Sequence, residues 1–461
     1  MDADSRQRLR TPARATVWYF AIGVFSKGLG LLFTPIFTRL LTGEGYGAYS
    51  YYMSLLGFGG ILISTLFSSG ICYGGFEKFG TESFLSHAVR FALLTAPAIG
   101  LFIALFSGIG PTLGILLILQ LISDAIVGLF LTRHKYSYGY KRIATLSLFS
   151  AVLPPVLSVF LIYFGGFDYR ARIYSLLSVS LLAVGFVLFR VLKAGVHPEG
   201  GEREYIKRSA LSQLPLAGAN ALSAEADKLI VARALGSTAL AKYSVAFSLG
   251  GGLSFALNAV SSALCPWILR KIRTGDGDIV LRVTRLTLTL LCALALILIA
   301  AAPEALSLLA PSEYGEAVGA VMPIALSVIP SFGVTVISLV LTWRGLARIS
   351  ARLCSAGTLI GVLSCLILVP TLGYLGAGIS VLVSPVSSLI LLMIRERREG
   401  GFGVISSRVL LVSITLAFIF GIFIRLLYDY AFLRFFFTIP PALVGLFALL
   451  EFRKYVFEKK Q

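Results

Sequence analysis

Seven charged side chains interrupt or border long apolar stretches of this sequence. An ionisable group that faces lipid costs about 3 kcal/mol or more, so such groups normally face a protein partner or a water-filled cavity. Amines and carboxylates in a cavity of this kind bind charged substrates, protons or ions. The seven residues are Lys27, Arg39, Asp124, Glu225, Asp227, Lys228 and Arg233.

The cations among them suit an anionic substrate. Lys27 lies near the middle of the first apolar stretch, where Gly28 leaves room for a polar group. It either lines a cavity as a substrate-binding cation or pairs with a neighbouring acid for stability. Arg39 and Arg233 lie at the ends of two stretches, where they either receive a phosphate group or extend to lipid head groups. The predicted substrate-binding residues are Lys27, Arg39, Lys228 and Arg233.

The acids are candidates for ion coupling. Glu225 and Lys228 are three positions apart and can neutralise each other on one helix face. Asp227 projects about 100° away from Lys228 and needs another partner or water. Asp124 is an isolated acid in the first half of the chain. We predict that Asp124, Glu225 and Asp227 couple transport to a proton or ion; the alternative is that they form ion pairs that lock a helix bundle.

The elements that hold these residues are predicted to be membrane-spanning helices. The 461 residues are 57% hydrophobic and 13% charged, whereas soluble domains carry about 25% charged residues. The apolar stretches approach the roughly 20 residues that cross a bilayer as a helix. Inside hydrocarbon the backbone needs internal hydrogen bonds, which excludes isolated strands. We predict about fourteen spans, at 15–38, 47–70, 84–106, 111–131, 143–164, 173–192, 209–232, 241–264, 283–302, 318–341, 351–369, 375–394, 404–424 and 435–452.

The basic residues support this topology. Cytoplasmic segments of membrane proteins carry an excess of Lys and Arg. With the N-terminus placed inside, most of the 40 Lys and Arg residues fall on the cytoplasmic side. Only Lys27 and Lys228 fall within spans. Seven residues fall on the outer side of the membrane: Arg39, Arg170, Arg172, Arg233, Lys242, Arg425 and Arg434. Both termini are therefore predicted to lie in the cytoplasm.

An internal repeat divides the chain. Segments 39–57 and 233–251 match at a constant offset of 194, and both link two predicted spans on the outer side. A second, shorter sequence match relates segment 139–144 to segment 345–350. Six spans per copy give two parallel bundles around a central cavity, the architecture of a transporter. The matched pairs are Arg39/Arg233, Leu41/Leu235, Tyr49/Tyr243, Ser50/Ser244, Ser54/Ser248, Leu55/Leu249 and Gly57/Gly251.

The predicted organisation of this all-α polytopic membrane protein has four parts. They are an N-terminal six-helix bundle (1–192), a charged cytoplasmic linker (193–208), a C-terminal six-helix bundle (209–394), and an additional helix pair with a basic cytoplasmic tail (395–461).

Other classes of function find little support. The sequence has no P-loop, G-x-S-x-G or H-E-x-x-H motif, so no enzyme is predicted. The 5 cysteines and 3 histidines are scattered, which argues against a disulfide framework, a metal site or a cofactor. The net charge of +18 is spread in short clusters between spans, so no nucleic-acid partner is predicted.

Two segments carry a family resemblance. Segment 21–50 resembles the first span and loop of bacterial polysaccharide flippases, the O-antigen and capsule transporters of the multidrug/oligosaccharidyl-lipid/polysaccharide superfamily. Segment 225–246 is similar to the seventh span of that family. The residues that match the family pattern are Lys27, Pro35, Arg39, Tyr46, Gly47, Tyr49, Asp227, Lys228 and Gly236.

The resemblance implies a function in the inner (plasma) membrane. The expected substrate is a polyprenyl-diphosphate-linked oligosaccharide, flipped from the cytoplasmic to the outer leaflet and coupled to a proton or sodium gradient. The expected partners are membrane lipids and a polysaccharide polymerase or glycosyltransferase. Two alternatives stay open. One is a drug/cation antiporter of the same superfamily, which would need a net acidic cavity, and the other is a non-transporting membrane subunit of a polysaccharide assembly complex.

Overall fold

The computed structural model describes Gly23, Phe25 and residues 28–137, 139–193, 201–399 and 406–456. Every regular element in these described ranges is a helix. The chain forms two compact units, Met1–Glu225 (unit 1) and Ala226–Gln461 (unit 2). The candidate Lys27 lies outside the described residues.

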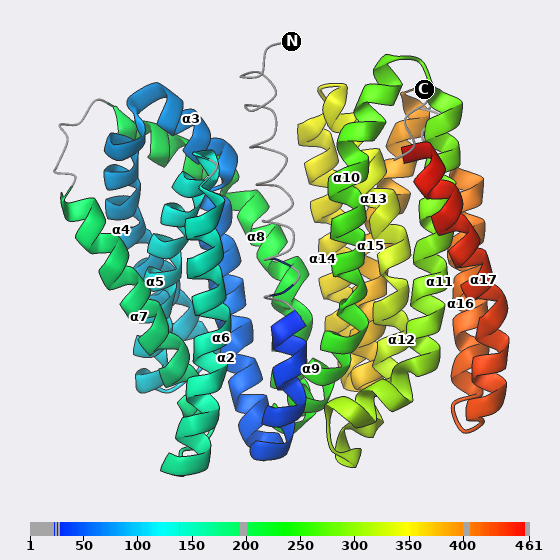
Figure 1. Ribbon diagram of the computed structural model, residues 1–461, viewed down its shortest axis with the longest axis horizontal. Coiled ribbons are helices and arrows are strands. Elements are labelled where there is room, and N and C mark those ends of the chain that lie inside the picture. Colours follow the sequence, from blue (N-terminus) through cyan, green and yellow to red (C-terminus); the bar gives the residue numbers. More distant parts are fainter. Residues whose placement is uncertain are drawn as a thin grey trace. The chain divides into compact units, whose positions relative to one another are not determined.

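Unit 1 is built around α5, which packs against α2, α4 and α7 (Figure 1). Leu117 and Leu121 of α5 are fully buried, as expected for the central helix of a bundle. The helices of this unit are Gly28–Leu40, α2 (Gly43–Leu66), α3 (Ser69–Phe79), α4 (Thr81–Ser107), α5 (Pro111–Tyr136), α6 (Tyr140–Gly165), α7 (Arg170–Lys193) and the first part of α8 (Glu202–Leu235).

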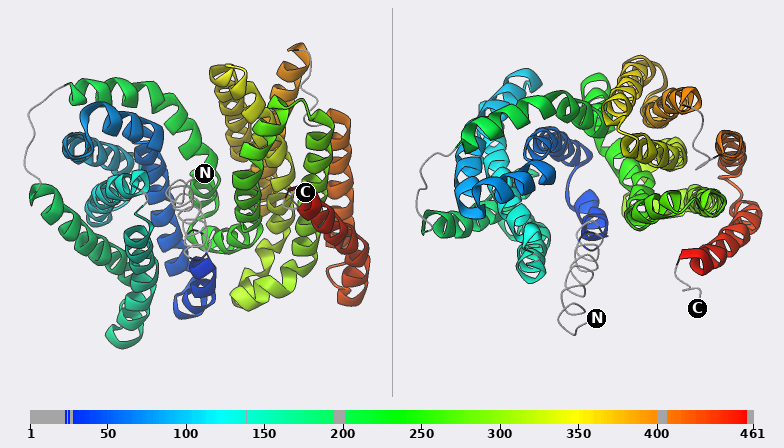
Figure 2. Two further views of the ribbon diagram at one scale, coloured as in Figure 1. Left: turned by 45° about the horizontal axis from the view of Figure 1, so that its top comes forward. Right: turned by 90° about the horizontal axis from the view of Figure 1, so that it is seen from above.

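Unit 2 has its core among α11, α12, α13 and α15. The closest pair is α14 and α15, where Gly357 and Gly361 let the two backbones meet at Ser388 and Ser384. Seen from above, α16 and α17 lie at one edge of this unit (Figure 2). The helices are the end of α8, α9 (Ser237–Gly251), α10 (Leu253–Arg273), α11 (Gly277–Leu309), the 3₁₀ helix η1 (Ser312–Ala317), α12 (Val318–Leu326), α13 (Val328–Trp343), α14 (Ala347–Leu372), α15 (Tyr374–Arg398), α16 (Ser407–Leu426) and α17 (Ala431–Val456).

The prediction of an all-α polytopic membrane protein is confirmed. Twelve described segments are long and apolar enough to cross a membrane. The other two of the fourteen predicted spans also fall on helices. Span 15–38 meets the short apolar helix Gly28–Leu40, and span 209–232 lies within the 34 residues of α8. Helix α8 is less apolar than the rest because it has charged residues towards both ends and polar residues such as Gln213 and Asn220 between them.

Most of the basic residues of unit 2 lie at one end. Its successive spans alternate in direction, so the α10–α11 and α13–α14 links, the end of α15 and the start of α16 lie at the same end as the last residues of α17 (Figure 1). Arg344 Nη1 in the α13–α14 link donates a hydrogen bond to the carbonyl oxygen of Glu399, directly after α15, at 3.5 Å. Arg282 lies 5.1 Å from the ring of Tyr455. This clustering agrees with the charge distribution expected of one membrane face, and its assignment to the cytoplasm stays a prediction.

The two repeat segments begin corresponding helices. Helix α2 starts at Gly43 and α9 starts at Ser237, again 194 positions apart. Glycine at position 236 has a φ of 89°, a conformation that favours glycine, and it separates α8 from α9. The boundary between the compact units falls inside α8, after Glu225. The predicted four-part division at 192, 208 and 394 stays a prediction.

Candidate functional site

The most buried of the candidate acids is Asp227 in α8. Its side chain is only 8% exposed. The hydroxyl of Tyr243 in α9 donates a hydrogen bond to its Oδ2 atom at 2.5 Å, and Tyr243 is itself fully buried. Two helices of unit 2 therefore meet at one buried carboxylate, which is an arrangement suited to holding a proton or a cation.

Lys228 follows Asp227 in sequence and faces an aromatic ring. Its Nζ atom lies 4.5 Å from the centroid of Phe247 in α9. The ring of Phe247 in turn lies 6.0 Å from that of Tyr243. A cation over an aromatic face keeps its charge at a low desolvation cost. Asp227 and Lys228 of α8 therefore both contact α9, Asp227 through Tyr243 and Lys228 through Phe247.

Unit 1 has a polar cluster of its own around Asp124 in α5. The Nε2 atom of Gln120 donates to Asp124 Oδ1 and to Ser180 Oγ, both at 2.9 Å. Gln120 is buried, whereas Asp124 is exposed. The hydroxyl of Tyr52 is also buried close to Asp124, without a hydrogen-bond partner among the described residues. Because Asp124 lies midway along a spanning helix, it needs water or a protein partner rather than lipid beside it.

Glu225, the remaining acid, lies against the backbone of α2. A Cβ atom built on Gly57 would come within 2.6 Å of Glu225 Oε1. A side chain at position 57 would therefore displace the Glu225 carboxylate from its present place. Sequence analysis identified Gly57 as a repeat position, but it gave no reason for glycine there.

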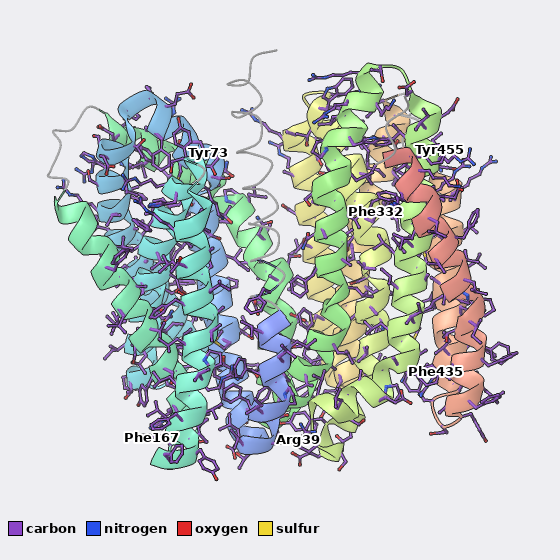
Figure 3. The ribbon with its side chains drawn as sticks, in the orientation of Figure 1. Arg39, Tyr73, Phe167, Phe332, Phe435 and Tyr455 are labelled. Atoms are coloured by element: carbon purple, nitrogen blue, oxygen red, sulfur yellow. The ribbon has the colours of Figure 1, made fainter. Side chains whose placement is uncertain are left out.

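Arg39 and Arg233 are both exposed at the ends of their helices. Arg39 lies at the end of its helix in Figure 3, where its Nη1 atom donates to the carbonyl oxygen of Pro35 at 3.1 Å. Arg233 is in the last turn of α8. Exposure suits both predicted roles, phosphate binding and contact with lipid head groups, and the choice between them stays a prediction.

Arg172 of α7 is a residue whose role sequence analysis missed. Its guanidinium carbon lies 3.6 Å from the ring centroid of Phe37 and 3.9 Å from that of Tyr49. These rings come from the helix Gly28–Leu40 and from α2, so Arg172 joins three helices of unit 1. Charge counting only placed it on the outer side. The repeat position Tyr49 was the one available signal.

The C-terminal helix pair is fixed by a buried charge that sequence analysis also missed. Arg434 of α17 is 1% exposed and forms a salt bridge with Glu304 of α11. Its guanidinium also lies 5.7 Å from the ring centroid of Tyr428. A lone buried arginine would be costly, so the pair holds α17 against α11. This contact accounts for α17 as part of unit 2 and not as a loose appendage.

Comparison with known proteins identifies the fold. No protein-family model and no curated sequence matches this chain. The chain is similar to the solved structure of the lipid II flippase MurJ in an inward closed conformation, with a TM-score of 0.65 and 14% identity over 95% of this chain and 98% of that one. It is similar to an inward-facing multidrug resistance MATE family transporter of the MOP superfamily, with a TM-score of 0.56 and 16% identity over 85% and 97%. It is also similar to a MOP superfamily transporter from Pyrococcus furiosus, with a TM-score of 0.52 and 17% identity over 85% and 96%. The chain therefore has the fold of the MOP superfamily, and the structures that it matches are of transporters and not of enzymes.

Proposed function

We propose that this protein is a flippase. Its substrate would be a polyprenyl-diphosphate-linked oligosaccharide, moved by alternating access from the cytoplasmic to the outer leaflet of the inner (plasma) membrane. The observation that carries the proposal is how much of the chain matches the fold of the lipid II flippase structure. The likeness to the lipid II flippase reaches 95% of this chain with a TM-score of 0.65, against 85% and 0.56 for a multidrug transporter.

The candidate cations support an anionic substrate. Lys228 rests on Phe247 about two turns before the end of α8, where an amine can bind one charge of a diphosphate. Arg39 and Arg233 are exposed at helix ends, where they could bind the diphosphate as it leaves. Lys27, near the middle of the first predicted span, completes the proposed set.

The candidate acids support coupling to an ion gradient. Asp227 is buried and held by Tyr243, so binding a cation or proton there would change the hydrogen bond between α8 and α9. That change gives the site two states, which coupling requires. Asp124 and Glu225 are the corresponding candidates in unit 1, with Asp124 supported by Gln120.

The drug/cation antiporter is the second candidate, since its fold likeness covers most of the chain. A cation substrate would need an acidic site, whereas Lys228 places an amine beside Asp227. A non-transporting subunit of a polysaccharide assembly complex, in contact with a polymerase or glycosyltransferase, is the third. The leaflet assay described next distinguishes these two candidates from a flippase.

The test is a leaflet assay with the purified protein in proteoliposomes. A fluorescent polyprenyl-diphosphate glycan is placed in one leaflet, and its appearance in the other is followed with and without a proton or sodium gradient. We expect gradient-dependent transfer, which Lys228→Met slows at least about tenfold because the loss of one charge contact is worth over about 1.4 kcal/mol. Lys242→Met is the matched control, because Lys242 forms an ion pair with Glu316 at 2.8 Å.

Two results would overturn the proposal. Export of organic cations without movement of the glycan lipid would establish the antiporter. Absence of both activities in a protein that binds a polymerase or glycosyltransferase would establish the subunit.

A further inference from the structure

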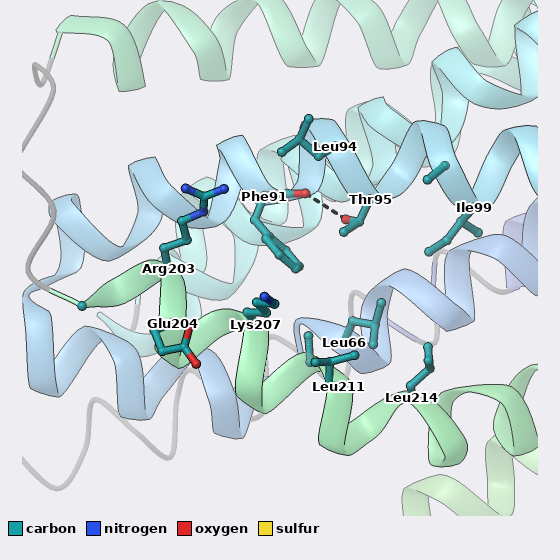
Figure 4. Close-up of a pocket in the computed structure, with 13 residues that line it drawn as sticks. Leu66, Phe91, Leu94, Thr95, Ile99, Arg203, Glu204, Lys207, Leu211 and Leu214 are labelled. Atoms are coloured by element: carbon teal, nitrogen blue, oxygen red, sulfur yellow. Dashed lines mark hydrogen bonds between the residues drawn. The ribbon is translucent and has the colours of Figure 1, made fainter.

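Unit 1 contains a groove of about 850 Å³ between α4 and the first half of α8. The wall formed by α4 consists of residues three and four positions apart, which share one face of a helix. Leu66 of α2 closes one side of the groove. In Figure 4, Phe91 of α4 and Lys207 and Leu211 of α8 are directed into the space between the two helices. The α4 residues are Phe91, Leu94, Thr95, Ala98 and Ile99.

The facing stripe of α8 changes character along its length. Arg203, Lys207, Leu211 and Leu214 all line the groove, and their spacing places them on one helix face. The stripe extends over roughly 16 Å at 1.5 Å per residue. Both cations lie at the end where α8 begins, and both leucines lie further along. Glu204 also borders the groove, but in Figure 4 its carboxylate points away from α4.

The opposite face of α8 holds the helix in place. Glu202 is buried and accepts a hydrogen bond from Ser83 Oγ at 2.7 Å. The Tyr205 hydroxyl donates to the carbonyl oxygen of Ile71 at 3.3 Å, and its ring packs 6.0 Å from that of Phe84. The groove therefore does not depend on its contents to position α8.

The apolar part of the groove is open at its side. Leu94 is 70% exposed and Leu211 is 61% exposed. In a spanning helix such side chains lie in contact with lipid. A hydrocarbon chain could therefore enter from the bilayer while the cations stay at the level of the head groups.

We propose that this groove binds an anionic phospholipid of the surrounding bilayer. Arg203 and Lys207 hold the phosphate of the head group, and one acyl chain lies between α4 and α8 along Phe91 and Leu211. The cations are one turn apart, which suits a single phosphodiester. Charge decides the class, because the guanidinium of Arg203 and the ammonium of Lys207 favour an anionic lipid over a zwitterionic one. This lipid is a resident of the fold and is distinct from a transported substrate.

The test is binding of phosphatidylglycerol to the purified full-length protein in detergent, measured by native mass spectrometry. Phosphatidylcholine with the same acyl chains is the comparison lipid. We expect Arg203→Gln to weaken phosphatidylglycerol binding about fivefold, and the double variant with Lys207→Gln about 25-fold, because each cation near a head group contributes a similar factor. Arg208→Gln is the matched control, since Arg208 is an exposed neighbour in α8 that does not line the groove.

A second variant tests the apolar half. Ala98→Trp fills the groove beside α8 without removing a charge, and we expect it to weaken binding by a similar factor. Equal phosphatidylglycerol binding by wild type, Arg203→Gln and Ala98→Trp would overturn the proposal. Equal binding of phosphatidylcholine would overturn the part assigned to the cations. Tighter binding of polyprenyl phosphate than of phosphatidylglycerol at this groove would show that it is a substrate site. These outcomes are independent of the leaflet assay, because they measure binding alone.

Discussion

The two repeats place a tyrosine at the same position and surround it with opposite charges. Tyr49 in α2 lies under the guanidinium of Arg172, 3.9 Å from its ring centroid. Tyr243 in α9 donates its hydroxyl proton towards the carboxylate of Asp227 at 2.5 Å. One repeat uses the face of the ring and the other uses the hydroxyl. The comparison shows that the two segments share a helix start and an aromatic residue, while the charged group beside the tyrosine differs.

The acids of the two units differ in the same way. Asp227 is buried and directly bonded to a tyrosine. Asp124 is exposed and bonded to Gln120, which also holds Ser180. Unit 2 therefore encloses its acid in a packed core, whereas the acid of unit 1 stays accessible beside Gln120. The predictions below test this difference from the largest expected effect to the smallest.

Removal of the acids should give the largest difference between the two units in the loss of unfolding free energy. Asp227→Ala leaves the buried hydroxyl of Tyr243 without its acceptor, so we expect the free energy of unfolding to fall by about 2–3 kcal/mol. Asp124→Ala removes an exposed group and leaves the bond between Gln120 and Ser180, so the expected loss is below about 1 kcal/mol. Chemical unfolding in detergent micelles measures both. Equal losses would contradict the contrast between a buried and an exposed acid.

Removal of the two hydroxyls should give the next largest contrast. Tyr243→Phe deletes a hydrogen bond to a charged group, and we expect it to lower the free energy of unfolding by about 1.5–2 kcal/mol. Tyr49→Phe keeps the ring beneath Arg172, so we expect less than about 0.5 kcal/mol. The same unfolding measurement applies, with Tyr163→Phe as the control, since Tyr163 is 73% exposed. A larger loss for Tyr49→Phe than for Tyr243→Phe would reverse the assignment of roles.

These contrasts also mark how far the sequence predicts the structure. Hydropathy and basic residues predicted the spanning helices, because burial in lipid demands long apolar stretches whatever the partner helices are. The offset of 194 predicted equivalent helix starts, which Gly43 and Ser237 confirm. The partner of Asp227 was not predicted. Tyr243 lies 16 positions away, across the helix break at Gly236, and only the packing of α8 against α9 joins them.

Two other features lacked any local signal. Arg172 and Arg434 look like ordinary outer-face cations in sequence, since a charge count does not distinguish a buried arginine from an exposed one. The segment 193–208 looked like a hydrophilic linker, yet its described part begins α8 and carries the cations of a groove. Side-chain partners between distant helices depend on tertiary packing, which no single stretch of sequence specifies.

Removal of the cations should produce a smaller contrast. Arg172→Met deletes a guanidinium that contacts Phe37 at 3.6 Å and Tyr49 at 3.9 Å, and we expect a loss of about 1 kcal/mol. Lys228→Met removes the cation that lies over Phe247, where the distance to the ring centroid is longer, at 4.5 Å, and we expect about 0.5 kcal/mol from this cation–π contact. Arg172→Lys should recover part of the loss. If Lys228→Met proved the more destabilising, unit 2 and not unit 1 would be the one that depends on its cation.

The helix starts themselves should give the smallest effect. The Thr42 side chain accepts a hydrogen bond from the backbone nitrogen of Gly45 at 3.1 Å and so caps α2, whereas α9 follows Gly236 without a side-chain cap. We expect Thr42→Ala to lower the free energy of unfolding by about 0.5 kcal/mol, because an exposed cap contributes at the low end of its usual range. Thr42→Ser should retain the bond, and Ser237→Ala should have no effect in unit 2. Amide hydrogen exchange at Gly45 provides the direct measurement: faster exchange in Thr42→Ala but not in Thr42→Ser indicates the cap. Equal exchange in both would mean that the Thr42 side chain does not stabilise the start of α2, which would then begin without a side-chain cap, as α9 does.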